Sequence, residues 1–545
     1  MTVIDKMFQR IDRQTLILSF FSFLIVAFGQ PAWISGLGVI ASAIGYTLFW
    51  RGMLLLPTLR DQFLISVVWY SAVQGVQLSW MATTNYMGPF ILVLYLFLIV
   101  AMGVQFGLLS FFIRKPLSLS NIFNIAGCWV ILEWLRLFFL CGFTWNPVGL
   151  ALTDSLYSLQ FASVWGVFGL SFWVVLVNVM ALKAFLDRSI RLGGVWALLA
   201  AFPYLFGFAQ QKWVESQYPV RSEVNVALIQ TALFPEQKEF DPASPHSYVP
   251  PLSQWERIFS VLDGTQKVDL MVFPEAALPF GAHRMCYDLS EVKEYFQESV
   301  MPPLEKPFAS LQRGGWKVNN AFMIQSLANH FKTHIVIGLD DLDADGKAYN
   351  AAFHFFPQNL PYERYEKRVL VPLTEYLPMP HWPRFSRYVA KQFGILGSFE
   401  FGKEAKVFHA PCPVGMSICL EETFSGVTRD LRVQGAEVFV NLTNDAWFPG
   451  SKLPQQHFDH GRVRAAENGV AILRACNTGV TGGIDCFGKP LAQLVPSETE
   501  VSSLYFSLPI RTYSTLYTKW GDQAILVISC LSMISYFLLG KKKLL

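Results

Sequence analysis

The chain of 545 residues has the composition of a membrane protein. It is 52% apolar and only 15% charged, whereas about a quarter of the residues of a typical soluble protein are charged. The net charge of +3 gives no indication of a nucleic-acid partner. The eight cysteines form no CxxC pair and have no metal-ligand spacing with histidine, so we expect no metal and no dissociable cofactor.

Eight apolar stretches are candidate membrane-spanning helices, because crossing the hydrocarbon core takes roughly 20 mainly apolar residues. Their ranges are 14–30, 33–50, 62–80, 88–113, 124–142, 161–186, 193–210 and 523–539. The sequence therefore predicts a multi-span α-helical membrane bundle.

The basic residues between these stretches predict the orientation of the bundle. They precede the first stretch, fill alternate loops and end the chain, whereas the loops 81–87 and 143–160 contain no Lys or Arg. Loops rich in Lys and Arg stay in the cytoplasm. We therefore expect residues 1–211 to form a seven-helix transmembrane domain and 212–515 an extracytoplasmic domain. Residues 516–545 then form a final transmembrane helix with a basic cytoplasmic tail, so both termini are cytoplasmic.

Glu133 and Arg136 lie three residues apart in the fifth stretch and therefore share one helix face. Ionisable groups at membrane depth are costly and usually face the interior of the bundle or an aqueous cavity. We favour a structural ion pair that neutralises itself. The alternative, a lining for the entrance of a lipid head group, stays open.

Residues 212–515 change to short apolar strands that alternate with helical stretches, which is typical of an α/β domain with buried sheets. The predicted strands are 224–230, 268–274, 334–339, 349–356, 413–419, 437–443, 470–476 and 502–508. The predicted helices are 252–263, 421–434 and 455–468. Two long stretches, 276–322 and 379–400, fit neither pattern. The second interleaves aromatic with basic residues, which suits either a segment that touches a bilayer or an Ω-loop packed on its own domain.

Three polar side chains, each expected at the exit of a strand, are the candidate catalytic residues: Glu275, Lys367 and Cys419. A thiol between a strand and a helix meets the positive end of the helix, which favours the thiolate. A lysine nearby would favour the thiolate further and stabilise an oxyanion, while a glutamate would take the proton. Each residue alone is more often structural. Their order and their common position at strand exits favour catalysis.

These three residues with their flanks resemble the Glu–Lys–Cys triad of the nitrilase (carbon–nitrogen hydrolase) superfamily. With the membrane bundle, the chain is similar to the apolipoprotein N-acyltransferase family within it. The motifs that carry this similarity are LTNDAWF (442–448), RVRAAENG (462–469), RACNTGVTG (474–482), TLYTKWGD (515–522), EWLR (133–136) and GFTWNPVG (142–149). The resemblance spans nearly the whole chain and implies a nitrilase-like α-β-β-α sandwich for the soluble half.

The resemblance implies a two-step acyl transfer in the bacterial inner membrane, with the catalytic domain on the periplasmic side. Cys419 would take the sn-1 acyl chain of a phospholipid, typically phosphatidylethanolamine, as a thioester. The α-amine of a diacylglyceryl-cysteine lipoprotein would then accept the chain as an amide. Glu275 would be the general base, and Lys367 would hold the oxyanion. Both substrates are lipids, so membrane lipids surround the reaction.

Supporting residues follow from the same resemblance. Glu375 matches the second glutamate of the superfamily, and Glu421 matches an acidic position in its Cys-x-Glu pattern, where Leu420 replaces the usual aromatic residue. Phe240 stands nearest to a family tryptophan, so an aromatic contact survives without an indole hydrogen bond. Trp382 and Trp447 are candidate substrate contacts.

Two other functions compete with acyl transfer. A membrane-tethered amidase would share the triad, but it would leave the seven-span bundle unexplained. A transporter or scaffold with an inert nitrilase domain would need a polar path through its spans, and the apolar stretches contain few charges apart from Glu133 and Arg136.

Overall fold

The computed structural model divides into two compact units. It describes residues 12–238, 240, 246–359, 361–378, 382–393, 398–495 and 497–541. The first unit contains Met1–Gln217, Gly450–Asn468 and Ser514–Leu545, and the second contains Tyr218–Pro449 and Gly469–Tyr513. Four of the basic residues that predicted the orientation lie outside the described residues, namely Lys6, Arg10, Lys542 and Lys543.

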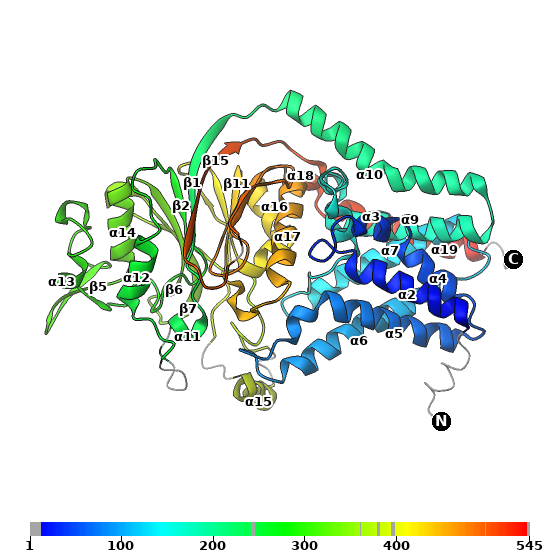
Figure 1. Ribbon diagram of the computed structural model, residues 1–545, viewed down its shortest axis with the longest axis horizontal. Coiled ribbons are helices and arrows are strands. Elements are labelled where there is room, and N and C mark those ends of the chain that lie inside the picture. Colours follow the sequence, from blue (N-terminus) through cyan, green and yellow to red (C-terminus); the bar gives the residue numbers. More distant parts are fainter. Residues whose placement is uncertain are drawn as a thin grey trace. The chain divides into compact units, whose positions relative to one another are not determined.

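The first unit is helical (Figure 1). Among the described residues, four helical segments are long and apolar enough to cross a membrane. They are α6 (Ile91–Ser110), Leu119–Phe138, α9 (Ala162–Leu186) and α10 (Ile190–Gln217), where the second comprises α7 (Leu119–Leu135) and the 3-10 helix η3 (Arg136–Phe138). Two shorter apolar helices, α2 (Arg13–Phe28) and the Gln523–Leu539 part of α19 (Gln523–Lys541), coincide with the first and last predicted spans. The chain is therefore a membrane protein.

The other two predicted spans are helical as well, but they are not among these apolar segments. The third is α5 (Leu59–Gln77), which begins where Thr58 accepts a hydrogen bond from the Asp61 amide. The second is divided into α3 (Leu37–Ile40), the π-helix η1 (Ala41–Gly45) and α4 (Tyr46–Met53). Asn178 of α9 accepts from the Tyr46 amide at 2.9 Å and donates to the Ser42 carbonyl at 2.8 Å. This side chain satisfies backbone groups that the π-helix leaves without their regular partners.

Helix α17 (Leu453–Asn468) belongs to the first unit, although its sequence lies between two strands of the second. Gln456 donates to the Gln77 carbonyl at 2.8 Å, and Glu467 accepts from the Val167 amide at 2.8 Å. Its other partners in this unit include Trp145, whose ring lies 5.4 Å from that of His457. Hydrogen bonds of buried polar side chains therefore connect α17 to helices that are distant in the sequence.

The second unit is built on two six-stranded sheets (Figure 1). The order of the first is β15-β1-β2-β6-β7-β8, and the order of the second is β14-β13-β12-β11-β10-β9. The strands of the first are β1 (Ser222–Gln230), β2 (Leu270–Val272), β6 (His334–Leu342), β7 (Ala348–Phe355), β8 (Glu363–Glu366) and β15 (Ser502–Ile510). Those of the second are β9 (Val407–Phe408), β10 (Val414–Ile418), β11 (Val438–Thr443), β12 (Ala471–Cys476), β13 (Gly482–Ile484) and β14 (Pro490–Gln493). In each sheet the three central strands are parallel.

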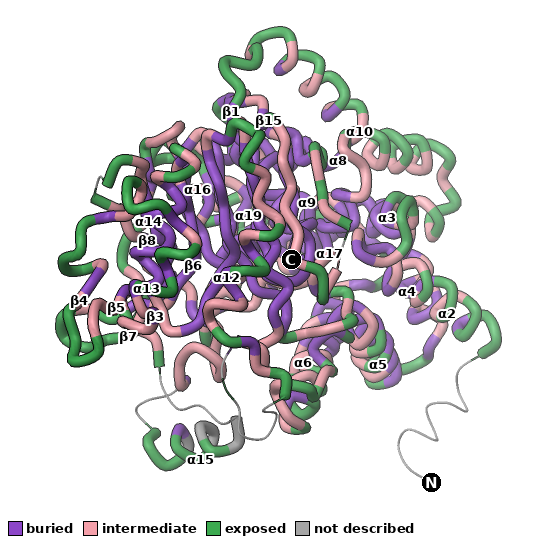
Figure 2. Tube along the Cα trace, turned by 60° about the vertical axis from the view of Figure 1, so that its left-hand side comes forward, coloured by how far each residue is buried: buried purple, intermediate pink, exposed green. Residues whose placement is uncertain are grey.

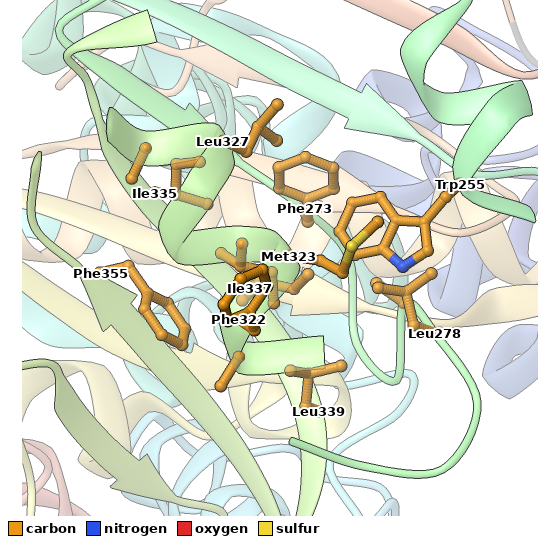
Figure 3. Packing of buried hydrophobic residues seen from close by; sticks show 14 of the residues in the cluster. Trp255, Phe273, Leu278, Phe322, Met323, Leu327, Ile335, Ile337, Leu339 and Phe355 are labelled. Atoms are coloured by element: carbon orange, nitrogen blue, oxygen red, sulfur yellow. The ribbon is translucent and has the colours of Figure 1, made fainter. Parts of the chain in front are cut away.

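Alternate residues of the first sheet enter two different cores. Val226 and Leu228 join one cluster with Met416 and Val440 of the second sheet, so this core lies between the two sheets. Ala227 and Ile229 face the opposite way, into a cluster with helices α12 (Pro251–Phe259) and α14 (Asn320–Phe331). Strands β2, β10, β11 and β12 are buried along their whole length, the condition drawn in purple in Figure 2. Figure 3 shows Trp255 of α12 and Phe322 of α14 in the outer cluster. Helix α16 (Ser425–Val433) packs on β10 of the second sheet. These layers confirm the expected α-β-β-α sandwich.

The two stretches that fitted neither pattern contain regular structure. Residues 276–322 include a three-stranded sheet of β3 (Tyr287–Asp288), β4 (Ala309–Gln312) and β5 (Gly315–Val318). Gly315, the first residue of β5 after the turn from β4, has φ +124°, a conformation that favours glycine. The second stretch contains helix α15 (Pro383–Phe393). Strands this short carry too little alternation to be recognised in a sequence.

Candidate active site

Glu275 follows β2. The backbone around Glu275 lies very close to Gly338 of the neighbouring strand β6. The Gly338 amide of β6 donates to the Pro274 carbonyl at 3.1 Å, and the Ala277 amide donates to the Gly338 carbonyl at 2.9 Å. A Cβ atom at Gly338 would lie only 2.6 Å from the Glu275 Cα. Glycine at this position is therefore what lets the two strands hold Glu275 at the sheet edge.

Lys367 joins two carboxylates inside the second unit. Its Nζ donates to Oε1 of Glu275 at 2.9 Å and to Oε1 of Glu375 at 2.8 Å. Asn350 of β7 donates to the same two oxygens, at 2.7 and 2.8 Å. Lys367 is only 1% exposed, and Glu275 only 6%. Glu275 after β2, Lys367 after β8, Asn350 inside β7 and Glu375 thus form one hydrogen-bonded network with one cation and two anions.

The charge balance of this network keeps Lys367 protonated. Burial alone would disfavour the ammonium, but the carboxylates of Glu275 and Glu375 outweigh it and raise the pKa of Lys367 well above its usual value. An ammonium has three N–H donors, and the two glutamates take two of them. The third remains for an oxygen that becomes negative during a reaction.

Cys419 lies in a backbone conformation that is rare for a residue with a side chain. It follows β10 and begins the short 3-10 helix η7 (Cys419–Thr423), with φ +52°. Asn441 of the neighbouring strand β11 donates to the Cys419 carbonyl at 3.2 Å and supports this turn. Strain of this kind persists where the surroundings enforce it, and it is concentrated at functional sites.

The surroundings of Cys419 favour the neutral form of its thiol. Desolvation and the carboxylate of Glu275 raise the pKa of Cys419 well above its usual value, although Lys367 acts in the opposite direction. Burial and Glu275 thus oppose the thiolate, which the helix end and Lys367 were expected to favour. The five-residue 3-10 helix does not supply the dipole of a full α-helix, because α16 begins only at Ser425.

Glu421 links the turn that contains Cys419 to the segment that contains Lys367 through hydrogen bonds. Its Oε2 accepts from the Ile418 amide and from the Tyr365 hydroxyl, both at 2.8 Å. Its Oε1 accepts from the amides of Arg368 at 2.6 Å and Val369 at 3.0 Å. Burial raises the pKa of Glu421 from its usual value. This carboxylate therefore positions two candidate catalytic residues and lies away from solvent.

The three candidate substrate contacts are exposed. The exposed fractions are 62% for Phe240, 67% for Trp382 and 38% for Trp447. The ring of Phe240 packs edge-on against Tyr248, with 5.8 Å between the ring centres. Their contact with substrate stays a prediction.

Sequence reasoning missed several polar side chains around the site. Asn350 is a polar residue inside the apolar run of β7, which is the one signal that could have identified it. Arg474 is fully buried and pairs with Glu422 at 2.9 Å and with Asp445 at 3.3 Å. This ion cluster supports the segment after Cys419 from the second sheet. Within the described part of the chain, no group of three or more His, Cys, Asp or Glu side chains could hold a metal ion.

Two family models match this chain, each over a different part of it. A model of the carbon-nitrogen hydrolase family matches residues 251–505, and a model of the apolipoprotein N-acyltransferase N-terminal domain matches residues 21–180. Solved structures similar to the chain include a carbon-nitrogen hydrolase from Helicobacter pylori and Nit3 of Saccharomyces cerevisiae, a member of the nitrilase superfamily. They are 16% and 19% identical to it, with TM-scores of 0.32 and 0.34. Each covers 53% of this chain, and the chain covers 89% and 91% of them.

Curated relatives extend over both halves. The apolipoprotein N-acyltransferase of Chlamydia caviae is 32% identical over 97% of this chain and 99% of its own length. That of Chlamydia pneumoniae is 30% identical over 96% and 98%, and that of Geobacter metallireducens is 29% identical over 74% and 71%. The sandwich fold and the family match define an enzyme of the carbon-nitrogen hydrolase superfamily. With relatives this similar along its whole length, the chain belongs to the apolipoprotein N-acyltransferase family.

Proposed function

We propose that this protein transfers the sn-1 acyl chain of a phospholipid, through a thioester on Cys419, to the α-amine of a diacylglyceryl-cysteine lipoprotein. The observation that carries the proposal is the buried network in which Lys367 holds Glu275 and Glu375, with the charges of Glu275 and Lys367 acting on the Cys419 thiol. The relatives' name supports N-acylation of a lipoprotein. We take phosphatidylethanolamine as the donor.

In the first step, Glu275 takes the thiol proton while Sγ of Cys419 attacks the ester carbonyl. Lys367 and Asn350 both bind Oε1 of Glu275, so Oε2 is the oxygen that receives the proton. The remaining N–H of Lys367 stabilises the tetrahedral oxyanion. The carbon–oxygen bond then breaks, and Glu275 returns the proton to the departing glycerol oxygen, which gives a lysophospholipid and a thioester.

In the second step, the lipoprotein amine attacks the thioester carbonyl. Glu275 takes a proton from the amine as the carbon–nitrogen bond forms, and it passes the proton to Sγ as the carbon–sulfur bond breaks. Glu375 and Asn350 hold Lys367 and Glu275 in the same geometry for both steps. A site that excludes water protects the thioester from hydrolysis between the steps.

The membrane half supports lipid substrates, because acyl chains that stay in the bilayer need not be transferred into water. We place residues 212–515 on the periplasmic side of the bacterial inner membrane and both termini in the cytoplasm. The distribution of Lys and Arg among the loops supports this orientation.

The reaction itself tests the proposal. Purified full-length protein is incubated with phosphatidylethanolamine and a diacylglyceryl-cysteine peptide, and the peptide is analysed by mass spectrometry. We expect an added amide-linked acyl chain with the natural protein and none with Cys419→Ser. Release of ammonia from a small amide without peptide acylation would instead favour the amidase alternative.

A further inference from the structure

Lys238 is a buried lysine that the proposed mechanism does not use. It ends the short helix α11 (Pro235–Lys238) and is only 8% exposed. Its Nζ donates to the carbonyl oxygen of Ala276 at 2.7 Å. Lysines are almost always exposed, because taking an ammonium out of water is costly. Ala276 directly follows Glu275, so this costly contact supports the backbone of the proposed general base.

Ala276 has a backbone conformation that is rare for a residue with a side chain. Its φ is +43°, in the left-handed region. The peptide group after Ala276 is fixed at both of its polar atoms. Lys238 binds the carbonyl oxygen, and the Ala277 amide donates to the Gly338 carbonyl at 2.9 Å. Because strain of this kind persists only where the surroundings enforce it, Lys238 and Gly338 together hold the turn.

The backbone of Lys238 is itself fixed, so its side chain starts from a defined place. Gln254 of α12 donates to the Lys238 carbonyl at 3.3 Å and to the Val249 carbonyl at 2.8 Å. Earlier in the same segment, the Leu233 amide donates to Oδ1 of Asn477 at 3.0 Å. Because these hydrogen bonds already order the segment, the contact of Lys238 with Ala276 costs little additional backbone entropy.

We propose that Lys238 is a positioning residue, which holds the Glu275 carboxylate against Lys367 by fixing the left-handed turn at Ala276. The inference rests on the proposed function for the role of Glu275 as general base. Without the Lys238 contact, Ala276 relaxes toward an ordinary backbone conformation, and the Glu275 carboxylate moves away from its hydrogen bond with Lys367. Lys238 thus acts through the backbone and not on the substrate.

The first measurement needs no acyl transfer. Desolvation and the carboxylate of Glu275 raise the pKa of Cys419, so a displaced Glu275 lets iodoacetamide alkylate Cys419 faster. We expect Lys238→Met in the full-length protein to increase the alkylation rate at least about twofold at about pH 8. Loss of the lysine charge alone would act in the opposite direction, since a cation favours the thiolate. The increase should vanish in the Glu275→Gln background, where no carboxylate remains to be displaced.

Ala276→Gly tests the backbone route, because glycine adopts a positive φ without strain. In this background the turn no longer depends on the lysine, so Lys238→Met should change the alkylation rate by less than about twofold. The same comparison is made for thioester formation. We expect Lys238→Met to slow it about tenfold with Ala276 intact and to leave it nearly unchanged with Ala276→Gly. Lys347→Met, at an exposed turn, is the control and should alter neither rate.

An alkylation rate in Lys238→Met equal to that of the natural protein overturns the inference. An increase that persists with Glu275→Gln also overturns it, because it would come from access to Cys419 alone. So does an equal effect of Lys238→Met with and without Ala276→Gly. If Lys238→Met accumulates only together with Ala276→Gly, the inference is supported, and if neither protein accumulates, the lysine serves folding elsewhere and the inference fails. A natural protein that forms no thioester contradicts the proposed function but leaves the alkylation result intact.

Discussion

At the scale of single residues, Lys367 is a buried cation held between two carboxylates. It is 1% exposed and lies within 2.9 Å of oxygens from two glutamates. A buried cation between two anions is favourable only while all three charges remain. The same ammonium also supplies the proposed oxyanion contact. The stability of the network and the proposed catalysis therefore both depend on Nζ of Lys367.

Lys367→Met is expected to slow thioester formation by about 10²–10³-fold, which is typical for the loss of one oxyanion donor. The intact mass of the protein, followed over time after addition of phospholipid, measures this rate. Lys293→Met is the matched control, because Lys293 forms an ion pair with Glu298 at the surface. A rate in Lys367→Met within about twofold of the natural protein would remove this lysine from the mechanism.

The protonation of Cys419 gives a second prediction at this scale. The thiolate is the reactive form, and the pKa of Cys419 is raised above the usual value of 9.0 by desolvation and Glu275. Between about pH 7 and 9, the thiolate fraction therefore increases about tenfold for each unit of pH. We expect the rate of Cys419 alkylation by iodoacetamide, measured by peptide mass spectrometry, to rise in the same proportion. Glu275→Gln removes a negative charge and should increase the rate at each pH. A rate that stays constant over this range would indicate a resting thiolate.

At the scale of elements, Glu421 connects the end of β10 with the segment after β8. Glu421→Gln keeps the shape of the side chain but replaces one acceptor oxygen by an amide that cannot accept. Two of its four donors, either Ile418 and Tyr365 or Arg368 and Val369, then lose their acceptor. Each orphaned buried donor costs about 1–3 kcal/mol.

We expect Glu421→Gln to lower the unfolding temperature and to slow thioester formation, because the Cys419 turn and the Lys367 segment separate. Tryptophan fluorescence on heating reports the first effect, and intact mass reports the second. Glu404→Gln changes an exposed glutamate in the same unit and should alter neither. An unchanged rate of thioester formation in Glu421→Gln would show that the hydrogen bonds of Glu421 do not position the catalytic residues.

The apolar strands were predictable from the sequence, whereas the 12-residue helix α14 and several short strands were not. All eight predicted strands of the second unit are present, because each carries a run of apolar residues between turn residues. The strands β8, β9, β13 and β14 have two to four residues each and were missed. Helix α17 was predicted as a helix, but its partners in the first unit were not, because a sequence shows amphipathicity and not the surface that covers it.

The site was predictable in part for the same reason. Glu275 and Cys419 stand out because each lies at the end of a predicted strand, and strand ends meet at sheet edges, whereas Lys367 follows β8, which was missed. Asn350 lies inside a strand, where its contact with both glutamates depends on register that the sequence alone does not fix. The raised pKa of the Cys419 thiol depends on burial, which also appears only in the folded chain.

At the scale of the whole molecule, the curated relatives extend over both halves of the chain. The Chlamydia caviae protein covers 97% of it, so the helical unit is as much part of this family as the sandwich. Helices with few charges and a domain of ordinary composition are what an enzyme needs when its substrates stay in the bilayer.

The proposed orientation predicts which residues a membrane-impermeant maleimide reaches in intact cells. Asp345→Cys, at an exposed turn after β6, should react from outside, and Arg114→Cys, in an exposed basic loop after α6, only after the membrane is opened. The unsubstituted chain controls for its natural cysteines, of which Cys530 is exposed. The reverse pattern would place the catalytic half in the cytoplasm.

The most direct test of the account is the intact mass of the full-length protein after exposure to phospholipid without an acceptor. We predict a mass increase equal to one acyl chain, located on Cys419, removed by hydroxylamine and absent from Cys419→Ala. Addition of a diacylglyceryl-cysteine peptide should then restore the original mass. A protein that gains no acyl chain, or gains it equally in Cys419→Ala, would contradict the thioester mechanism.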